Sequence, residues 1–321
     1  MKAARLVGPR QFEFLDVEKP SPKPGEVLVK IEYASICGSD LLTYDKVFPE
    51  EDYPLRTGLP CHETSGVVEE SMDESLKPGD RVVALTYTGG LLEYVTIPAN
   101  RCILVPPSID PRLAVLCQPI GTVVYAVQKL GSVLGQKVVI LGQGPIGLGF
   151  TEFLSQGGAS QVIVTDIVDA RLEMARKFGA TDTINASKED VIERVKELTG
   201  GHLADVVVDA CGVHETCNQV FHCLKVKGTA CIFGMPHGDP VFPFDWGTMY
   251  MKLPTIYVTN SARAGEVVDV VKVAVDLIAQ GRIDPGKMIT HDVPFSNVGR
   301  AYELFSRRIE GAVKPIINMS A

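Results

Sequence analysis

Apolar and polar residues alternate in short runs over the first third of the chain, a pattern typical of half-buried β-strands. Turn-forming segments rich in proline and glycine, such as Lys77–Asp80, separate these runs. The strands expected from this pattern are Glu26–Glu32, Thr64–Val68, Arg81–Leu85 and Glu93–Ile97. They predict an antiparallel, barrel-like N-terminal domain.

The pattern changes near Leu113, where apolar residues take helical spacing as far as Leu130. After Gly135, strand-like and helix-like segments alternate, which predicts a doubly wound parallel sheet covered by helices on both faces. The expected strands are Lys137–Leu141, Gln161–Asp166, Asp205–Asp209, Gly228–Phe233 and Thr255–Thr259. The expected helices are Ile146–Gln156, Ala170–Phe178, Lys188–Leu198 and Glu215–Leu224.

The C-terminal part is expected to add a helix over Ala264–Ala279, a short strand near Met288, a helix over Val298–Arg307 and a terminal strand over Val313–Ile317. A chain of 321 residues exceeds the usual size of a single core, so two domains are expected. The fold class is therefore α/β, with a β-rich N-terminal domain beside the parallel sheet.

Composition narrows the possible partners and the compartment. The net charge of -8 and the lack of a dense basic run argue against nucleic acid as a partner. No apolar run approaches the roughly 18 residues of a membrane span, and no signal peptide is recognised. The eight cysteines are scattered rather than paired, which predicts reduced thiols and a cytoplasmic location.

The glycines of Gly142-x-Gly144-x-x-Gly147 follow an apolar strand and open a helix. In that context the first allows a tight turn, the second lets the backbone approach a pyrophosphate, and the third lets helix and strand pack closely. Asp166 ends the next strand, where a carboxylate can bind the adenosine ribose and disfavour the 2′-phosphate of NADP. Arg171 also lies within reach of the ribose. These residues predict an NAD site.

A thiol, an imidazole and carboxylates also occur in the N-terminal part, at Cys37, Asp40, His62 and Glu63. Zinc favours sulfur and nitrogen ligands, and a catalytic zinc keeps three protein ligands and one open position. From spacing alone the indication is weak, because cysteines are commonly buried for structural reasons and a lone histidine is usually structural.

Taken together, Cys37–Asp40, His62–Glu63, Pro78–Val82 and the glycine turn resemble the medium-chain dehydrogenase/reductase superfamily. The resemblance covers nearly the whole chain and is to the zinc-dependent alcohol and polyol branch, with sorbitol, threonine and glucose dehydrogenases. It implies a GroES-like β-barrel catalytic domain of residues 1–124 and 261–321, and a Rossmann NAD-binding domain of residues 125–260.

The implied activity is hydride transfer between a secondary alcohol, polyol or sugar and NAD(H). By the same resemblance, Cys37 and His62 match zinc ligands, and Glu63 matches a carboxylate that can ligate the metal or lie close to it. Asp40 matches the carboxylate that orients the histidine. Ser39 matches the hydroxyl that begins the proton relay. A homodimer or homotetramer, formed through the cofactor domain, is implied as well.

The position of the third zinc ligand departs from the family pattern, because it is occupied by Gln118 rather than by glutamate or cysteine. An amide oxygen is a weaker zinc ligand than thiolate or carboxylate. Gln118, Cys117 or Glu63 could complete the shell, and Gln118 with Glu63 available is favoured. Thr122 matches a residue that contacts the nicotinamide, and Ile146 matches the apolar residue behind that ring.

The cysteine-rich loop that holds a structural zinc in many relatives is missing, since no cysteine lies between Cys61 and Cys102. One catalytic zinc per chain is therefore expected. Two other readings compete with a zinc dehydrogenase. One is a zinc-free quinone or enoyl reductase of the same superfamily, and the other is a non-catalytic dinucleotide-binding protein.

Overall fold

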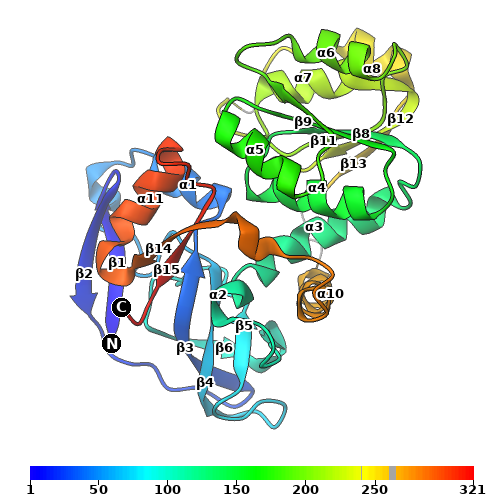
Figure 1. The fold of residues 1–321 in the computed structure, drawn as a ribbon. Helices are drawn as coiled ribbons and strands as arrows, with labels where there is room; N and C mark the ends of the chain where they lie inside the picture. The colour runs from blue at the N-terminus through cyan, green and yellow to red at the C-terminus, as the bar shows by residue number, and fades with distance from the viewer. Residues whose placement is uncertain (240, 260–264) are drawn as a thin grey trace. The chain divides into compact units, whose positions relative to one another are not determined.

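The computed structural model describes residues 1–239, 241–259 and 265–321 (Figure 1). The chain forms two compact units, the first made of Met1–Gly121 with Val268–Ala321 and the second of Thr122–Val267. The second boundary expected from the sequence, at residues 260 and 261, lies outside the described residues. No helix in the described ranges is long and apolar enough to cross a membrane.

The first unit contains a β-hairpin and a seven-stranded sheet. The hairpin strands are β1 (Lys2–Gly8) and β2 (Gln11–Asp16). The sheet strands are β3 (Glu26–Ser35), β4 (Glu63–Ser71), β5 (Arg81–Ala84), β6 (Tyr94–Pro98), β7 (Cys102–Leu104), β14 (Ile289–Pro294) and β15 (Lys314–Asn318). Their order is β14-β15-β3-β4-β5-β7, with β6 also paired to β3. Every pair is antiparallel except β14 with β15, so the C-terminal strands extend the N-terminal sheet.

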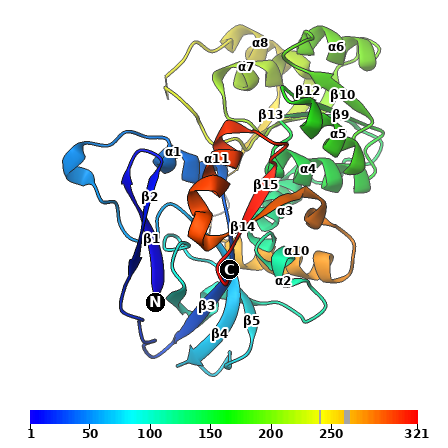
Figure 2. The same ribbon diagram turned by 60° about the vertical axis from the view of Figure 1, so that its left-hand side comes forward.

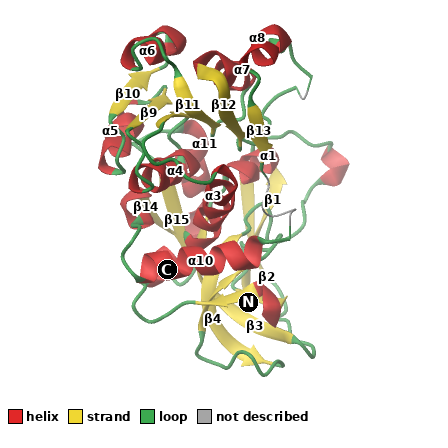
Figure 3. Ribbon diagram, turned by 90° about the vertical axis from the view of Figure 1, so that its right-hand side faces the viewer, coloured by secondary structure: helices red, strands yellow, loops and turns green. Residues whose placement is uncertain are grey.

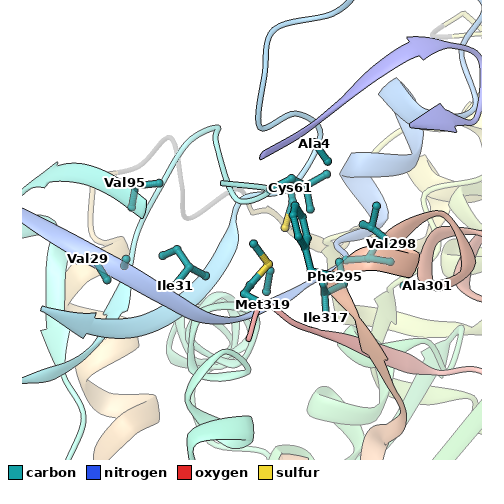
Figure 4. Packing of buried hydrophobic residues seen from close by; sticks show 14 of the residues in the cluster. Ala4, Val29, Ile31, Cys61, Val95, Phe295, Val298, Ala301, Ile317 and Met319 are labelled. Carbon is teal, nitrogen blue, oxygen red and sulfur yellow. The ribbon is translucent and has the colours of Figure 1, made fainter. Parts of the chain in front are cut away.

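The helices of the first unit are short except at its C-terminal part. They are α1 (Leu41–Tyr44), α2 (Pro111–Ala114), the start of α3 (Cys117–Leu130), most of α10 (Val267–Ala279), and α11 (Val298–Arg307). Helix α11 lies beside β2, β14 and β15 (Figures 1 and 2). Its buried face carries Val298, Ala301 and Tyr302 at helical spacing. Figure 4 shows this core, in which Cys61 lies among apolar side chains that include Phe295.

The second unit is a six-stranded parallel sheet between two helical layers. Its strands run in the order β10 (Asp182–Asn185), β9 (Gln161–Asp166), β8 (Lys137–Leu141), β11 (Ala204–Asp209), β12 (Leu224–Ile232) and β13 (Thr255–Val258). Helices α4 (Pro145–Gln156) and α5 (Asp169–Lys177) cover one face. Helices α6 (Val191–Leu198), α7 (His214–Cys223) and α8 (Trp246–Lys252) cover the other (Figures 1 and 3). The expected α/β fold with a doubly wound parallel sheet is confirmed.

Several boundaries differ from those expected, each for a local reason. The helix expected over Leu113–Leu130 is broken between α2 and α3, where Pro119 has no N–H to donate to the carbonyl of Val115. Strand β12 begins at Leu224, because α7 passes into it without a loop. The sequence pattern did not identify β1, β2, β10 or α8. Ala264, the expected first residue of α10, lies outside the described residues.

Candidate functional site

Three of the four residues expected to bind metal come together at one end of the pair formed by β3 and β4. Ser35 at the end of β3 is paired with Glu63 at the start of β4, so the antiparallel register places Cys37 close to His62. The Cys37 sulfur, a ring nitrogen of His62 and a carboxylate oxygen of Glu63 all lie within 4.8 Å of one another. Among the described residues, this is the one group of three such side chains that could hold a metal ion.

Asp40 joins the two halves of this cluster. One of its carboxylate oxygens accepts a hydrogen bond from Nδ1 of His62 at 2.8 Å, and the other accepts one from the backbone N–H of Cys37 at 2.9 Å. The carboxylate is buried. A hydrogen bond on Nδ1 fixes the ring orientation and leaves Nε2 as the nitrogen available to a metal.

The electrostatic environment favours a cation at this position. Burial by itself would lower the pKa of His62, but the Asp40 carboxylate and the Cys37 thiol raise that pKa well above its ordinary value. Burial also raises the pKa of Asp40, against the opposing effect of His62. A proton and a metal ion therefore compete for Nε2 of His62, and metal affinity is expected to fall as the pH is lowered.

Glu63 is held by a buried lysine. Its Oε2 accepts a hydrogen bond from the Lys314 ammonium at 2.6 Å and another from the Ser35 hydroxyl. Lys314 also donates to the Ile36 carbonyl at 2.8 Å, and its side chain is 2% exposed. One oxygen of Glu63 is thus occupied by protein donors, which weakens this carboxylate as a metal ligand.

The donor set fits a divalent cation. Cys37 binds metals as a thiolate, so with Asp40 and Glu63 the cluster can carry three negative charges against the single positive charge of Lys314. The difference is the charge of one divalent ion. Buried charges are costly unless they are compensated, and a sulfur-nitrogen pair with a nearby carboxylate suits zinc. The residues present therefore fit the expected metal.

The other residues expected near the metal are Gln118, Cys117 and Ser39, and their elements and burial are as follows. Gln118 lies buried in the first turn of α3, in the first unit. Cys117 is not in the group formed by Cys37, His62 and Glu63. Its thiol donates to the carbonyl of Leu113 at 3.8 Å, and burial raises its pKa to about 12. Ser39 is half-buried, two residues after Cys37.

The glycine turn of the second unit has the expected form. Gly142 has a φ of +94°, a conformation that side chains rarely adopt, and a Cβ there would overlap the sulfur of Cys211. A Cβ on Gly147 would overlap the carbonyl of Gly142. Helix α4 begins at Pro145 with Gly144 as its N-cap, so its free N–H groups point to the end of β8.

Asp166 is held at the end of β9 by the turn itself. Its carboxylate accepts hydrogen bonds from the backbone N–H groups of Gln143 at 2.8 Å and Val168 at 2.9 Å. The Nη1 atom of Arg171 lies 3.9 Å from Oδ2 of Asp166. Asp166 therefore belongs structurally to the glycine turn.

Two further residues are expected to contact the cofactor. Ile146 lies within the glycine turn, and Thr122 lies in the second unit. Ile146 is half-buried in the first turn of α4, and Thr122 is half-buried in α3.

Two residues of the cluster were not identified from the sequence. Ser35 is an ordinary strand residue, and nothing in the pattern marks it. Lys314 offered a signal, because it is the one charged residue in the expected terminal strand Val313–Ile317, whose other residues are apolar. A lysine is almost never fully buried unless it is paired, so its position implied a buried acidic partner.

Known proteins share this architecture. Residues 23–107 match the family model described as the alcohol dehydrogenase GroES-like domain, and residues 145–280 match the one described as zinc-binding dehydrogenase. A probable D-xylulose reductase A of Emericella nidulans is 31% identical over 335 residues, covering 93% of this chain and 91% of the relative.

Two solved structures carry nicotinamide cofactors. An alcohol dehydrogenase from Escherichia coli CFT073 in complex with NADH has a TM-score of 0.84 and 25% identity, covering 99% of both chains. A zinc-binding dehydrogenase from Sinorhizobium meliloti 1021 bound to NADP has a TM-score of 0.84 and 25% identity, covering 99% of this chain and 98% of the other.

The chain belongs to the medium-chain dehydrogenase/reductase superfamily, in its zinc-type polyol dehydrogenase branch. It is an oxidoreductase of the alcohol and polyol dehydrogenase type. The resemblance derived from the sequence is confirmed.

Proposed function

We propose that this protein oxidises a secondary alcohol, polyol or sugar, or reduces the matching ketone, with one catalytic zinc per chain and NAD(H) as the hydride carrier. The observation that carries the proposal is the Cys37, His62 and Glu63 cluster, braced by Asp40, in a chain that also has the dinucleotide turn at Gly142. The D-xylulose reductase relative supports a polyol or ketose as substrate.

Each side chain has a defined task in this proposal. Cys37 and His62 hold the metal, with Glu63 or Gln118 completing its protein ligands. When bound, zinc supplies the Lewis acidity that lowers the pKa of an alcohol oxygen. Asp40 keeps the His62 ring oriented. The Ser39 hydroxyl would begin the proton relay, taking up the proton that the alcohol loses as it passes its own proton on to solvent water.

The proposed stoichiometry of one zinc is supported by the segment between β5 and β6, residues 85–93. That segment contains no cysteine and so offers no thiolate to a structural zinc. The eight cysteines are all free thiols, which supports our proposal of a reducing, cytoplasmic environment.

The test is a metal analysis of the purified protein combined with assays in both directions. We expect close to one zinc per chain, oxidation of members of a polyol and secondary-alcohol panel with NAD, and reduction of D-xylulose or a related ketose with NADH. Removal of zinc with a chelator should abolish turnover, and added zinc should restore it. Full turnover by the zinc-free protein would refute the proposal.

The NAD preference is proposed to depend on Asp166. Its carboxylate, at the ribose end of the glycine turn, would repel the 2′-phosphate of NADP. We expect Asp166→Ser to lower kcat/KM for NAD and raise it for NADP, so that their ratio falls roughly tenfold or more, equivalent to about 1.4 kcal/mol. Steady-state kinetics with both cofactors measures this ratio. Asp182→Ser, also in the second unit, serves as a control, and an unchanged ratio in Asp166→Ser contradicts the assignment.

We also propose that two copies associate through the edge of the second unit's sheet. Strand β13 is the last strand on its side, and Val258 on it is 78% exposed. Trp246 and Met251 on α8 are also exposed. An edge strand and exposed apolar side chains in the same unit favour association with another chain.

Val258→Lys with Trp246→Glu is expected to convert the assembly to a monomer, because it places charges on this surface. Light scattering after size exclusion measures the mass. Leu134→Lys changes another exposed apolar residue of the same unit and should leave the mass unchanged. A double variant with the wild-type oligomeric mass would exclude this interface.

A further inference from the structure

Tyr302 is a fully buried tyrosine whose hydroxyl has no partner among the described residues. It lies on the inner face of α11 with 0% exposure, and its hydroxyl oxygen makes no hydrogen bond to any described residue. Its ring packs against those of Tyr44, with centroids 4.8 Å apart, and Phe12, with centroids 5.1 Å apart. The hydroxyl adds nothing to this aromatic packing, since phenylalanine would fill the same space.

Tyr302 packs beside the helical turn that carries Asp40. Tyr44 follows Asp40 by four residues on one helical turn, so the two side chains share a face, and Tyr302 packs against that face. Burial raises the pKa of Tyr302 well above its ordinary value, and Asp40, Cys61 and then Glu63 raise it further. The hydroxyl therefore remains protonated and available as a donor.

The charged groups near Tyr44 differ from those near Tyr302. After burial, the charged groups that act on the pKa of Tyr44 are first Asp45 and Arg10, which lie at the surface of the unit. The two packed tyrosines therefore have different charged neighbours, and Asp40 and Glu63 act on Tyr302.

A buried hydroxyl without a hydrogen bond is destabilising, and such groups in proteins are usually satisfied by an ordered water. A carboxylate has about four acceptor positions, and each Asp40 oxygen uses one in its bond to His62 or Cys37. Asp40 therefore has acceptor capacity left for one more donor.

We propose that Tyr302 is a positioning residue of the metal site, acting through one buried water that accepts a hydrogen bond from its hydroxyl and donates one to the Asp40 carboxylate. This link fixes Asp40, which in turn orients His62. The inference rests on the proposed function, because it assigns Tyr302 to the same zinc site.

The test is Tyr302→Phe, with zinc affinity measured by competition against a chromophoric chelator at fixed pH. Replacing groups that support metal ligands typically lowers metal affinity 10–100-fold, and we expect roughly tenfold here because the link is indirect. The metal-free variant should also unfold at a lower denaturant concentration than the metal-free wild type. Tyr53→Phe is the matched control: its hydroxyl bonds to Phe48 and Lys46, each at 3.3 Å, and its loss should leave zinc affinity unchanged.

Other outcomes distinguish the proposed role of Tyr302 from the proposed zinc site itself. If the hydroxyl of Tyr302 has no partner at all, its removal relieves a buried polar group, and Tyr302→Phe will unfold at a higher denaturant concentration with wild-type zinc affinity. Either of these results overturns the role of Tyr302 while leaving the zinc site intact. A wild-type protein that takes up no zinc overturns both proposals.

Discussion

Replacement of Cys37 by alanine is expected to reduce bound zinc from about one per chain to nearly none and to lower kcat roughly a thousandfold or more. Cys37 is the only thiol in the cluster with His62 and Glu63 among the described residues. Lewis acidity contributes several kcal/mol to stabilising the charge that develops on oxygen, and each 1.36 kcal/mol is a factor of ten in rate. Metal analysis and initial rates with NAD and a polyol measure both effects.

Cys102→Ala is the matched control for this substitution. Cys102 lies on β7 in the same unit and outside the metal cluster, and burial raises the pKa of its thiol to about 12, which disfavours the thiolate that binds metals. We expect it to keep zinc and activity. If Cys37→Ala also retains wild-type turnover, zinc bound at Cys37 has no part in the reaction.

The parts of the fold that follow a strong sequence period could be predicted. Strands β8, β9 and β11 are apolar runs bounded by turns, and their predicted bounds agree with the structure to within a residue. Strand β10, by contrast, has four residues, of which only Ile184 is apolar, so no period can be detected. Its pairing with β9 is determined by tertiary packing rather than by local pattern.

The residues of the candidate site likewise fall into those that could be predicted from the sequence and those that could not. For residues close in sequence, such as the glycines at 142, 144 and 147, the turn could be predicted from their spacing and from their place between an apolar strand and a helix. The partner of Glu63 could not be, because Lys314 is 251 residues away and reaches it only through the pairing of β15 with β3. For this reason the role of Glu63 stayed open at the level of the sequence. A carboxylate next to a predicted zinc ligand can bind either the metal ion or the ammonium group of a lysine, and only the folded structure shows that Lys314 is its partner.

Lys314→Met is expected to destabilise the protein by about 3–5 kcal/mol, because removing one partner of a buried ion pair leaves the other charge uncompensated. Methionine fills similar space, so the effect reports the lost charge rather than a cavity. Glu63 would remain buried, with the Ser35 hydroxyl still donating to its Oε2. Denaturant unfolding of the metal-free protein measures the loss.

Adding Glu63→Gln to Lys314→Met should restore much of this stability, because the double variant removes both charges. Lys19→Met, which breaks the partly exposed pair with Glu69 in the same unit, is the control and should change the midpoint little. Zinc should reduce the loss in Lys314→Met, since a divalent cation beside Glu63 supplies the positive charge that the lysine provided. A Lys314→Met protein with the wild-type midpoint, with and without zinc, would show that the lysine does not hold Glu63 and would return this carboxylate to the set of direct zinc ligands.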